Sequence, residues 1–231
     1  MQLFYLDKTK EETVLDQKES KHAIKILRKK KGDILDIIDG SGYLYKGEII
    51  IADINSCKIK ILEKNKKNKK HNYHLHIAIA PTKNINRFEW FLEKATEIGI
   101  DEITPIICSR SERKIIKHER CEKILLAATK QALKFYKPKL NNTINICEFI
   151  NTSMKGKKYI AHCHNFKKEE FIRQINHKKN TILIGPEGDF SIAEIELARK
   201  NNFQEISLGK SRFRTETAGI ISTHIINIKN N

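Results

Sequence analysis

The stretch Ile182-Leu-Ile-Gly-Pro-Glu-Gly-Asp-Phe-Ser191 decides how the larger part of the chain is built. An apolar strand runs straight into a turn with two glycines around a proline, and Ser191 then has capping-box spacing to Glu194 at the start of a helix. Strand-to-helix units of this kind build α/β sheets, which bind ligands at the carboxyl ends of their strands. A tight turn that holds no ligand fits the same residues, so the local pattern leaves both interpretations open.

The turn excludes two familiar ligand classes. No G-x-G-x-x-G follows a strand, and no G-K-[ST] follows the glycines, so neither a dinucleotide fingerprint nor a phosphate-gripping loop is present. Glu187 would also repel phosphate. The turn therefore favours a ligand with a cationic centre, or one held by backbone polar groups.

A second strand-to-helix connection, Ile206-Ser-Leu-Gly-Lys-Ser-Arg-Phe-Arg-Thr-Glu-Thr-Ala-Gly219, lies further along the chain. Arg212 and Arg214 flank Phe213, a composition that suits RNA because guanidinium groups bind phosphates or base edges and the ring stacks on bases. Thr215 is predicted to cap the following helix. Glu216 would then lie in its first turn, where a carboxylate favours the helix dipole, and this structural role competes with a catalytic one.

The pattern between residues 73 and 231 predicts one domain. Strands are expected at 74–80, 103–108, 159–164, 181–184 and 203–208, and helices at 87–98, 117–134, 169–175, 192–200 and 216–228. This alternation predicts a mostly parallel sheet covered by helices on both faces. Arg110 and Arg113 follow the strand at 103–108, which places them at the same edge as the two connections above, unless they belong to a solvated surface run.

The first part of the chain predicts a small β-rich module. Strands are expected at 2–6, 34–38, 43–51 and 58–62, with a short helix at 20–28 capped by Ser20. The lysine-rich run 64–70 has no apolar group to bury and is interpreted as a solvated linker, with contact to RNA phosphate as the alternative.

Composition limits the class of protein. Of 231 residues, 39% are hydrophobic and 31% charged, which excludes a disordered chain and a membrane protein. The net charge of +16 favours a polyanionic partner such as nucleic acid, although a lysine-biased composition would also produce it. Five cysteines without a C-x-x-C pair argue against a disulfide framework or a zinc ribbon. No metal is expected at His162-Cys163-His164, and no secretory signal is visible, so the protein is expected to be cytoplasmic.

Four segments resemble the RsmE family, the ribosomal RNA small-subunit uracil-N3 methyltransferases of the SPOUT class. They are His22-Ala-Ile-Lys-Ile-Leu-Arg-Lys-Lys-Lys-Gly-Asp33, Glu93-Lys-Ala-Thr-Glu-Ile-Gly99 with Ile103-Thr-Pro105, Leu183-Ile-Gly-Pro-Glu-Gly-Asp-Phe-Ser191, and Leu208-Gly-Lys-Ser-Arg-Phe-Arg-Thr-Glu-Thr-Ala218. The resemblance implies a PUA-like RNA-binding β-barrel at 1–68 and a SPOUT-type α/β methyltransferase domain at 72–231, with a C-terminal trefoil knot. It also implies S-adenosyl-L-methionine as cofactor, a homodimer, and 16S rRNA of the small ribosomal subunit as substrate.

The resemblance assigns roles to particular residues. The cofactor would be held by Ile184, Gly185, Gly188, Leu208, Gly209, Phe213 and Thr217. The catalytic candidates are Arg214, which would lie near the target base, and Glu187 and Glu216, which compete with water as proton acceptor. RNA would be bound by His22, Lys25, Arg28, Lys29, Lys31, Arg110, Arg113 and Arg212.

The chain departs from the family at three positions. Lys130 and Lys134 stand where the family often has Glu and Arg in the long helix, and Asp189 replaces a usual Gly, where it is expected to act as a turn or cap residue. Two other functions stay open: a SPOUT methyltransferase for another RNA position such as a ribose 2′-OH, and a non-catalytic RNA-binding factor of ribosome assembly.

Overall fold

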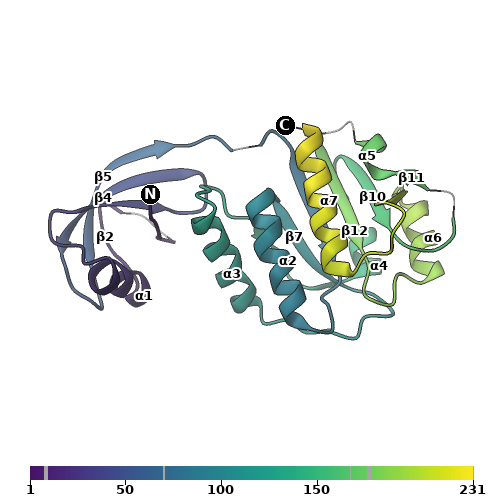
Figure 1. Cartoon of the computed structure of the whole chain (residues 1–231), viewed down its shortest axis with the longest axis horizontal. Helices are drawn as coiled ribbons and strands as arrows, with labels where there is room; N and C mark the ends of the chain where they lie inside the picture. The colour runs from purple at the N-terminus through teal and green to yellow at the C-terminus, as the bar shows by residue number, and fades with distance from the viewer. Residues whose placement is uncertain (8–9, 70, 167, 176–177, 231) are drawn as a thin grey trace. The chain divides into compact units, whose positions relative to one another are not determined.

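The computed structural model describes residues 1–7, 10–69, 71–166, 168–175 and 178–230, and Figure 1 shows its helices and strands. The chain divides into two compact units. The first consists of residues 1–70 and 126–137, and the second of residues 71–125 and 138–231. The last turns of the long helix α3 (His118–Gln131) therefore belong to the first unit.

A five-stranded sheet in the order β1-β3-β4-β5-β2 forms the first unit. β1 runs parallel to β3, and the other neighbouring strands are antiparallel. Alternate residues such as Leu35 and Ile37 are buried in the apolar core of this unit. The strands are β1 (Leu3–Tyr5), β2 (Glu12–Val14), β3 (Ile34–Ile38), β4 (Tyr43–Ile51) and β5 (Lys58–Lys66).

Strand β5 corrects the predicted linker. The strand expected to end at residue 62 continues to Lys66, so the first three residues of the lysine-rich run are part of the sheet. Lys64 pairs with Tyr45 in the register, and its ammonium lies 4.4 Å from the centre of the Tyr43 ring. Backbone pairing and cation–π contacts hold this segment without any apolar side chain of its own.

The predicted helix at 20–28 starts earlier and is not capped by Ser20. Helix α1 (Gln17–Lys21) begins after the cap residue Asp16 and continues into a π-helical segment, η1 (His22–Ile26). Ser20 is buried inside it, where its hydroxyl donates to the Leu15 carbonyl at 3.0 Å and accepts from the Cys57 N–H at 2.9 Å. Ser20 thus ties the helix to the start of β5.

Helix α3 ends at Gln131, three residues before the predicted end. Leu133 has a φ of +50°, and the Lys134 N–H donates to the Thr129 carbonyl, which closes the helix. Within the first unit, the Lys130 ammonium forms an ion pair with the buried carboxylate of Glu19. Lys130, which replaces a family glutamate, therefore has a structural partner in this chain.

An eight-stranded sheet forms the second unit, in the order β11-β13-β10-β12-β6-β7-β8 with β9 beside β7. Every strand pair recorded for it is parallel, which confirms the predicted parallel sheet. The strands are β6 (His74–Ile79), β7 (Glu102–Ile107), β8 (Lys139–Leu140), β9 (Ile144–Asn145), β10 (Lys157–Ala161), β11 (Glu169–Glu170), β12 (Lys179–Ile184) and β13 (Gln204–Ser207).

Helices cover both faces of this sheet, as predicted. On β6, Ile77 and Ile79 belong to the core under α2 (Ile85–Ile98), α5 (Phe171–Gln174) and α7 (Thr215–Asn230). Ala78, between them, and Ala80, just after the strand, belong to the opposite core under α4 (Ile146–Ile150) and α6 (Ile192–Lys200). Figure 1 shows α2 and α7 side by side over the sheet.

Short elements account for the remaining differences. The predicted helix at 169–175 begins as the two-residue strand β11, and only Phe171–Gln174 is helical. β2, β8, β9 and α4 were not predicted, because two- to five-residue elements carry too few positions for a periodic pattern. In the described part of the chain, none of the helices has both the length and the apolar composition needed to cross a bilayer.

Candidate active site

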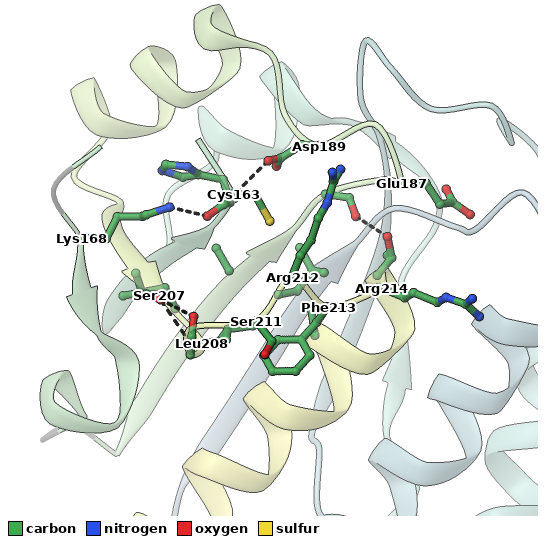
Figure 2. A pocket seen from close by; sticks show the side chains of 18 of the residues that line it. Cys163, Lys168, Glu187, Asp189, Ser207, Leu208, Ser211, Arg212, Phe213 and Arg214 are labelled. Atoms are coloured by element: carbon green, nitrogen blue, oxygen red, sulfur yellow. Dashed lines mark hydrogen bonds between the residues drawn. The ribbon is translucent and has the colours of Figure 1, made fainter. Parts of the chain in front are cut away.

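A cavity of about 640 Å³ lies at the carboxyl ends of β10, β12 and β13 in the second unit (Figure 2). It is bounded by three connections: the one after β10, through residues 161–163 and Lys168, the one at 184–189 after β12, and the one at 206–215 after β13. The two strand-to-helix connections that stand out in the sequence thus meet in one place. Parallel strands bring their carboxyl ends to the same edge, which is the physical reason for this meeting.

The loop after β12 is tightly built. The ring of Phe190 would lie 3.2 Å from a Cβ at residue 185, so Gly185 allows the close turn. Asp189 has a φ of +62°, and its N–H donates to the Pro186 carbonyl at 2.9 Å. Its carboxylate accepts the Cys163 N–H at 2.7 Å. Asp189 therefore acts as a turn residue, as expected, and also joins two walls of the cavity.

Helix α6 begins where the capping box was predicted. The Ser191 hydroxyl accepts the Glu194 N–H, and the Glu194 carboxylate accepts the Ser191 N–H at 2.7 Å. Glu194 also accepts the Ser109 N–H at 2.8 Å, which anchors the segment after β7. The Glu194 carboxylate thus binds both the segment after β7 and the start of α6 at this edge of the sheet.

The connection after β13 is attached to the first loop by Thr215. Its hydroxyl donates to the Gly185 carbonyl at 2.9 Å. Thr215 is the first residue of α7 and not the cap that the sequence predicted, because its side chain makes this tertiary bond. Gly209 has a φ of +145° and lies against the Phe213 ring, so the chain turns where glycine is favoured.

Five of the seven predicted cofactor residues line the cavity: Ile184, Gly185, Leu208, Gly209 and Phe213. The other two do not. The Gly188 carbonyl accepts a bond from the Arg110 guanidinium at 2.9 Å, and Thr217 lies half-buried on α7. Both residues therefore lie outside the lining of the cavity.

Two of the three predicted catalytic residues line the cavity, and the third does not. Arg214 and Glu187 line the cavity, and Glu187 accepts the Lys83 N–H at 2.9 Å. Glu216 does not line it; its carboxylate is buried, with one oxygen 3.8 Å from Arg87 Nε. Figure 2 shows Arg212 and Arg214 pointing in different directions from the two sides of Phe213.

Sequence reasoning missed the wall that His162, Cys163 and Lys168 form. His162 is buried there, and its Nε2 lies 2.9 Å from Glu205. Burial lowers the pKa of His162, and Glu205 opposes this effect. Lys168 donates to the carbonyls of His162 and His164, each at 2.7 Å. Only the parallel pairing of β10 with β12 and β13 brings this wall to the cavity.

The residues predicted to bind RNA occur in both units. Arg113 donates to the carbonyls of Thr82 and Lys83, so much of its guanidinium supports the neighbouring loop. Arg212 is exposed at the cavity. In the first unit, Lys25, Arg28 and Lys31 are exposed, whereas His22 and Lys29 are half-buried. Among the described residues, no group of three His, Cys, Asp or Glu side chains is arranged to hold a metal ion.

Known proteins share both parts of the chain. Residues 54–227 match the RNA methyltransferase domain family, and residues 15–62 match the RNA methyltransferase PUA domain family. "Ribosomal RNA small subunit methyltransferase E" from Mesomycoplasma hyopneumoniae is 34% identical over 77% of this chain and 80% of its own. "Ribosomal RNA small subunit methyltransferase E 2" from Borreliella burgdorferi is 32% identical over 90% of this chain and 88% of its own.

Solved structures agree with these matches. A probable rRNA-methyltransferase from Porphyromonas gingivalis superposes with a TM-score of 0.94 at 37% identity, over 100% of this chain and 98% of its own. A ribosomal RNA small subunit methyltransferase E from Neisseria gonorrhoeae bound to S-adenosyl methionine shares the fold, with a TM-score of 0.87 at 22% identity, over 99% and 98% of the chains. The fold and the two family matches together define an α/β RNA methyltransferase with a PUA domain. The chain belongs to the ribosomal RNA small subunit methyltransferase E family.

Proposed function

We propose that the protein transfers the methyl group of S-adenosylmethionine to N3 of a uridine in 16S rRNA of the small ribosomal subunit. The observation that carries the proposal is the cavity at the carboxyl edge of the sheet, where Gly185, Leu208 and Gly209 line the wall beside Arg214. The names of the relatives support the substrate, and their shared family supports the chemistry.

The cavity has the properties that S-adenosylmethionine requires. Its volume falls in the usual range for cofactor sites. The cofactor carries two cationic groups and a carboxylate, and the wall offers the acidic Glu187 and Asp189 as well as the basic Lys168 and Arg212. When bound, S-adenosylmethionine supplies a methyl group on a positively charged sulfur, already activated for transfer. We assign its binding to Ile184, Gly185, Leu208, Gly209 and Phe213, with Gly188 and Thr217 supporting the wall from outside.

The residues of the chain then have to orient the base and remove one proton. The new bond joins uracil N3 to the methyl carbon as the carbon–sulfur bond breaks, and the N3 proton leaves. The negative charge that develops spreads to O2 and O4 of the uracil. We place the Arg214 guanidinium beside these oxygens, where it stabilises the charge in the transition state.

Two carboxylates compete with water for the proton. Glu187 lies on the cavity wall, so we propose Glu187 or a water beside it as the acceptor. Glu216 lies behind the wall next to Arg87, and we give it a positioning role at the start of α7. Because N3 lies on the Watson–Crick edge, the uridine has to be unpaired or flipped when it enters.

We further propose a PUA-like β-barrel at 1–68 and a SPOUT-type domain at 72–231 with a C-terminal trefoil knot. The five-stranded sheet supports the former. The bond from Thr215 to Gly185 supports the knot, because the chain returns from β13 past the loop after β12 before it enters α7. Lys25, Arg28, Lys29 and Lys31 would bind rRNA phosphates, with His22 beside them, while Arg110, Arg113 and Arg212 would bind RNA near the cavity. The active form would be a cytoplasmic homodimer.

The proposal is tested by incubating the protein with labelled S-adenosylmethionine and small ribosomal subunits from a strain that lacks this modification. Primer extension on the recovered rRNA reads the product, since N3-methyluracil stops reverse transcriptase. Label with one new stop at a uridine is the expected result. Label without a stop would move the reaction to another position such as a ribose 2′-OH. No label and no cofactor uptake by calorimetry would favour a non-catalytic assembly factor.

A further inference from the structure

A second cavity, of about 780 Å³, lies at the opposite edge of the same sheet. It is bounded by the amino ends of β6, β7, β8 and β12, where His74, Glu102, Lys139 and Lys179 are the first residues of their strands. The cavity proposed for the cofactor lies at the carboxyl ends. The two are separated by a strand length, which for the six residues of β6 is about 20 Å.

A row of polar side chains crosses the sheet at this cavity. Thr181, His76 and Glu102 are direct neighbours in the register of β12, β6 and β7, and Lys139 follows on β8. Neighbours in parallel strands point to the same face. Parallel strands covered on both faces are normally apolar throughout, as the carboxyl-terminal half of β6 (residues 77–79) is here. The polar row is therefore not required by the fold.

The floor of the cavity is an ordered hydrogen-bond network. His76 is buried, with Nε2 2.7 Å from the Thr104 hydroxyl. The Asn141 amide donates both to that hydroxyl, at 2.7 Å, and to the Glu102 carboxylate, at 2.8 Å. The Thr104 hydroxyl has one proton and two acceptor lone pairs, so the direction of its bond with His76 depends on the ring tautomer. The other ring nitrogen, Nδ1, lies 3.8 Å from the Glu102 carboxylate. Burial lowers the pKa of His76 to about 4, so the neutral form is present at physiological pH.

The walls differ from the floor. Phe149 packs edge-on against His76, with ring centres 5.4 Å apart, and Ile144 and Met154 also line the cavity. These side chains offer an apolar surface to a planar ring. Lys155 and Lys179 are exposed at the rim. On the floor, the Lys139 ammonium lies 3.3 Å from the Glu102 carboxylate, so the two charges offset each other. The lysines at the rim are therefore the better position for a phosphate.

We propose that this cavity binds a nucleotide, with the base among Phe149, Asn141 and Glu102 and the phosphate between Lys155 and Lys179. A uracil or another base offers both donors and acceptors, which match the amide, hydroxyl and carboxylate of the floor. The nucleotide comes either from an RNA strand or from the free pool, and the two sources share this chemistry. The proposal goes beyond methyl transfer and does not depend on it.

The test uses calorimetry with the whole protein and three probes: uridine 5′-monophosphate, inorganic phosphate and a six-residue oligouridylate. S-Adenosylhomocysteine is present throughout to occupy the proposed cofactor cavity. Uridine monophosphate is expected to bind, and phosphate alone at least about tenfold more weakly. An oligouridylate that binds about tenfold tighter than the mononucleotide identifies RNA as the source, and equal affinities identify a free nucleotide.

Three variants locate the binding. The double change Lys155→Glu/Lys179→Glu should weaken the mononucleotide about tenfold or more. Ser153→Trp, at an exposed position on the lining, should block the mouth and have the same effect by a different cause. The matched control Lys123→Glu/Lys200→Glu changes the net charge equally at exposed residues outside the lining, and should stay within about twofold.

Amide NMR provides a second readout that does not depend on the variants' stability. The mononucleotide should shift the signals of Thr104 and Thr181, and not those of Gly185 and Gly209. The proposal is overturned if no probe binds, if phosphate binds as tightly as the nucleotide, or if Gly185 and Gly209 alone respond. Equal affinity in the rim variant and the control would also contradict it.

Discussion

Arg214 is the residue on which the proposed chemistry depends most directly. Arg214→Ala should lower kcat about 10²- to 10³-fold, because a donor to the developing oxyanion is lost. The Kd for S-adenosylmethionine should change less than about twofold. Arg214→Lys should recover part of the activity, since it keeps the charge and loses the planar fork. Methylation of small subunits measures kcat, and calorimetry measures cofactor binding.

The control for this prediction is Arg173→Ala, which removes an exposed guanidinium from α5 outside the cavity lining. It should leave both kcat and the Kd for S-adenosylmethionine unchanged. An unchanged kcat in Arg214→Ala would remove Arg214 from the mechanism.

His76 should make the protein sensitive to mild acid. Burial lowers its pKa from 6.5 to about 4; Glu102 opposes the shift, and His74 and Lys139 add to it. The unfolded chain therefore takes up this proton first, and stability falls as pH drops from about 6.5 towards 4. In His76→Gln, the melting temperature should fall less between pH 6.5 and about 5 than in the wild type. The Glu102 pKa is also lowered, so its contribution is lost below this window. Equal declines in both proteins would show that His76 does not titrate in this way.

Lys130 shows what a single-residue comparison with a family can and cannot establish. The sequence identifies it as a departure, since the family often has Glu there. The structure gives it a partner, the buried Glu19, more than a hundred residues earlier in the chain. Lysine in place of glutamate at position 130 is thus compatible with the fold because Glu19 provides the opposite charge. The residues around position 130 do not reveal this partner, since it lies far away in the sequence.

At the scale of elements, the contact between α2 and α7 depends on Gly219. A Cβ at this position would lie 2.6 Å from the Phe91 ring and 3.0 Å from Ile79. Gly219→Ala should therefore lower the free energy of unfolding by about 1–3 kcal/mol, although alanine favours an isolated helix by about 1 kcal/mol. Urea unfolding measures the change.

Two further variants check this explanation. Adding Phe91→Leu to Gly219→Ala should cost less than the sum of the two single changes, because the clash is relieved. His224→Ala, at an exposed position of α7, should have an effect within about 0.5 kcal/mol. A Gly219→Ala protein as stable as the wild type would mean that the helices can move apart freely.

Element boundaries were predictable where a local cause sets them. Helix α6 matches its prediction at both ends because its capping box lies in adjacent residues. Strand β5 was predicted too short because its last residues are charged, and only pairing with β4 keeps them extended. Ser20 and Thr215 were both predicted as caps and instead make bonds to Leu15, Cys57 and Gly185, two of them to partners distant in sequence.

At the scale of the whole molecule, two separable modules are expected. Arg28→Glu should weaken binding to small-subunit rRNA about three- to tenfold at low salt, because a phosphate contact is lost, and reduce the salt dependence of log K by about 1. The Kd for S-adenosylmethionine should not change. The same reversal at Lys123, exposed on α3, is the control and should affect neither. Loss of RNA and cofactor binding together in Arg28→Glu would argue against separable modules.

The proposed homodimer should be visible by sedimentation equilibrium, with twice the 26.9 kDa of one chain. Trp90 on α2 is 47% exposed, which is unusual for so large an apolar side chain, and we expect it in the interface. Trp90→Asp should shift the protein to monomer, whereas Val14→Asp, at an exposed residue of the first unit, should not. A monomeric wild type at micromolar concentration would contradict the dimer.

The sequence by itself determined the features whose causes are local: the alternation of strands and helices, the capping box of α6, the glycine turn after β12, and the basic, aromatic segment at 212–214. These depend on neighbours within a few residues, which the sequence displays directly. Only the tertiary structure decided which distant residues meet these segments in space. It brought His162 and Lys168 to the first cavity, moved Glu216 behind its wall, and aligned Thr181, His76 and Glu102 in a second cavity. Register between parallel strands controls these placements, and that register is set by packing across the whole sheet.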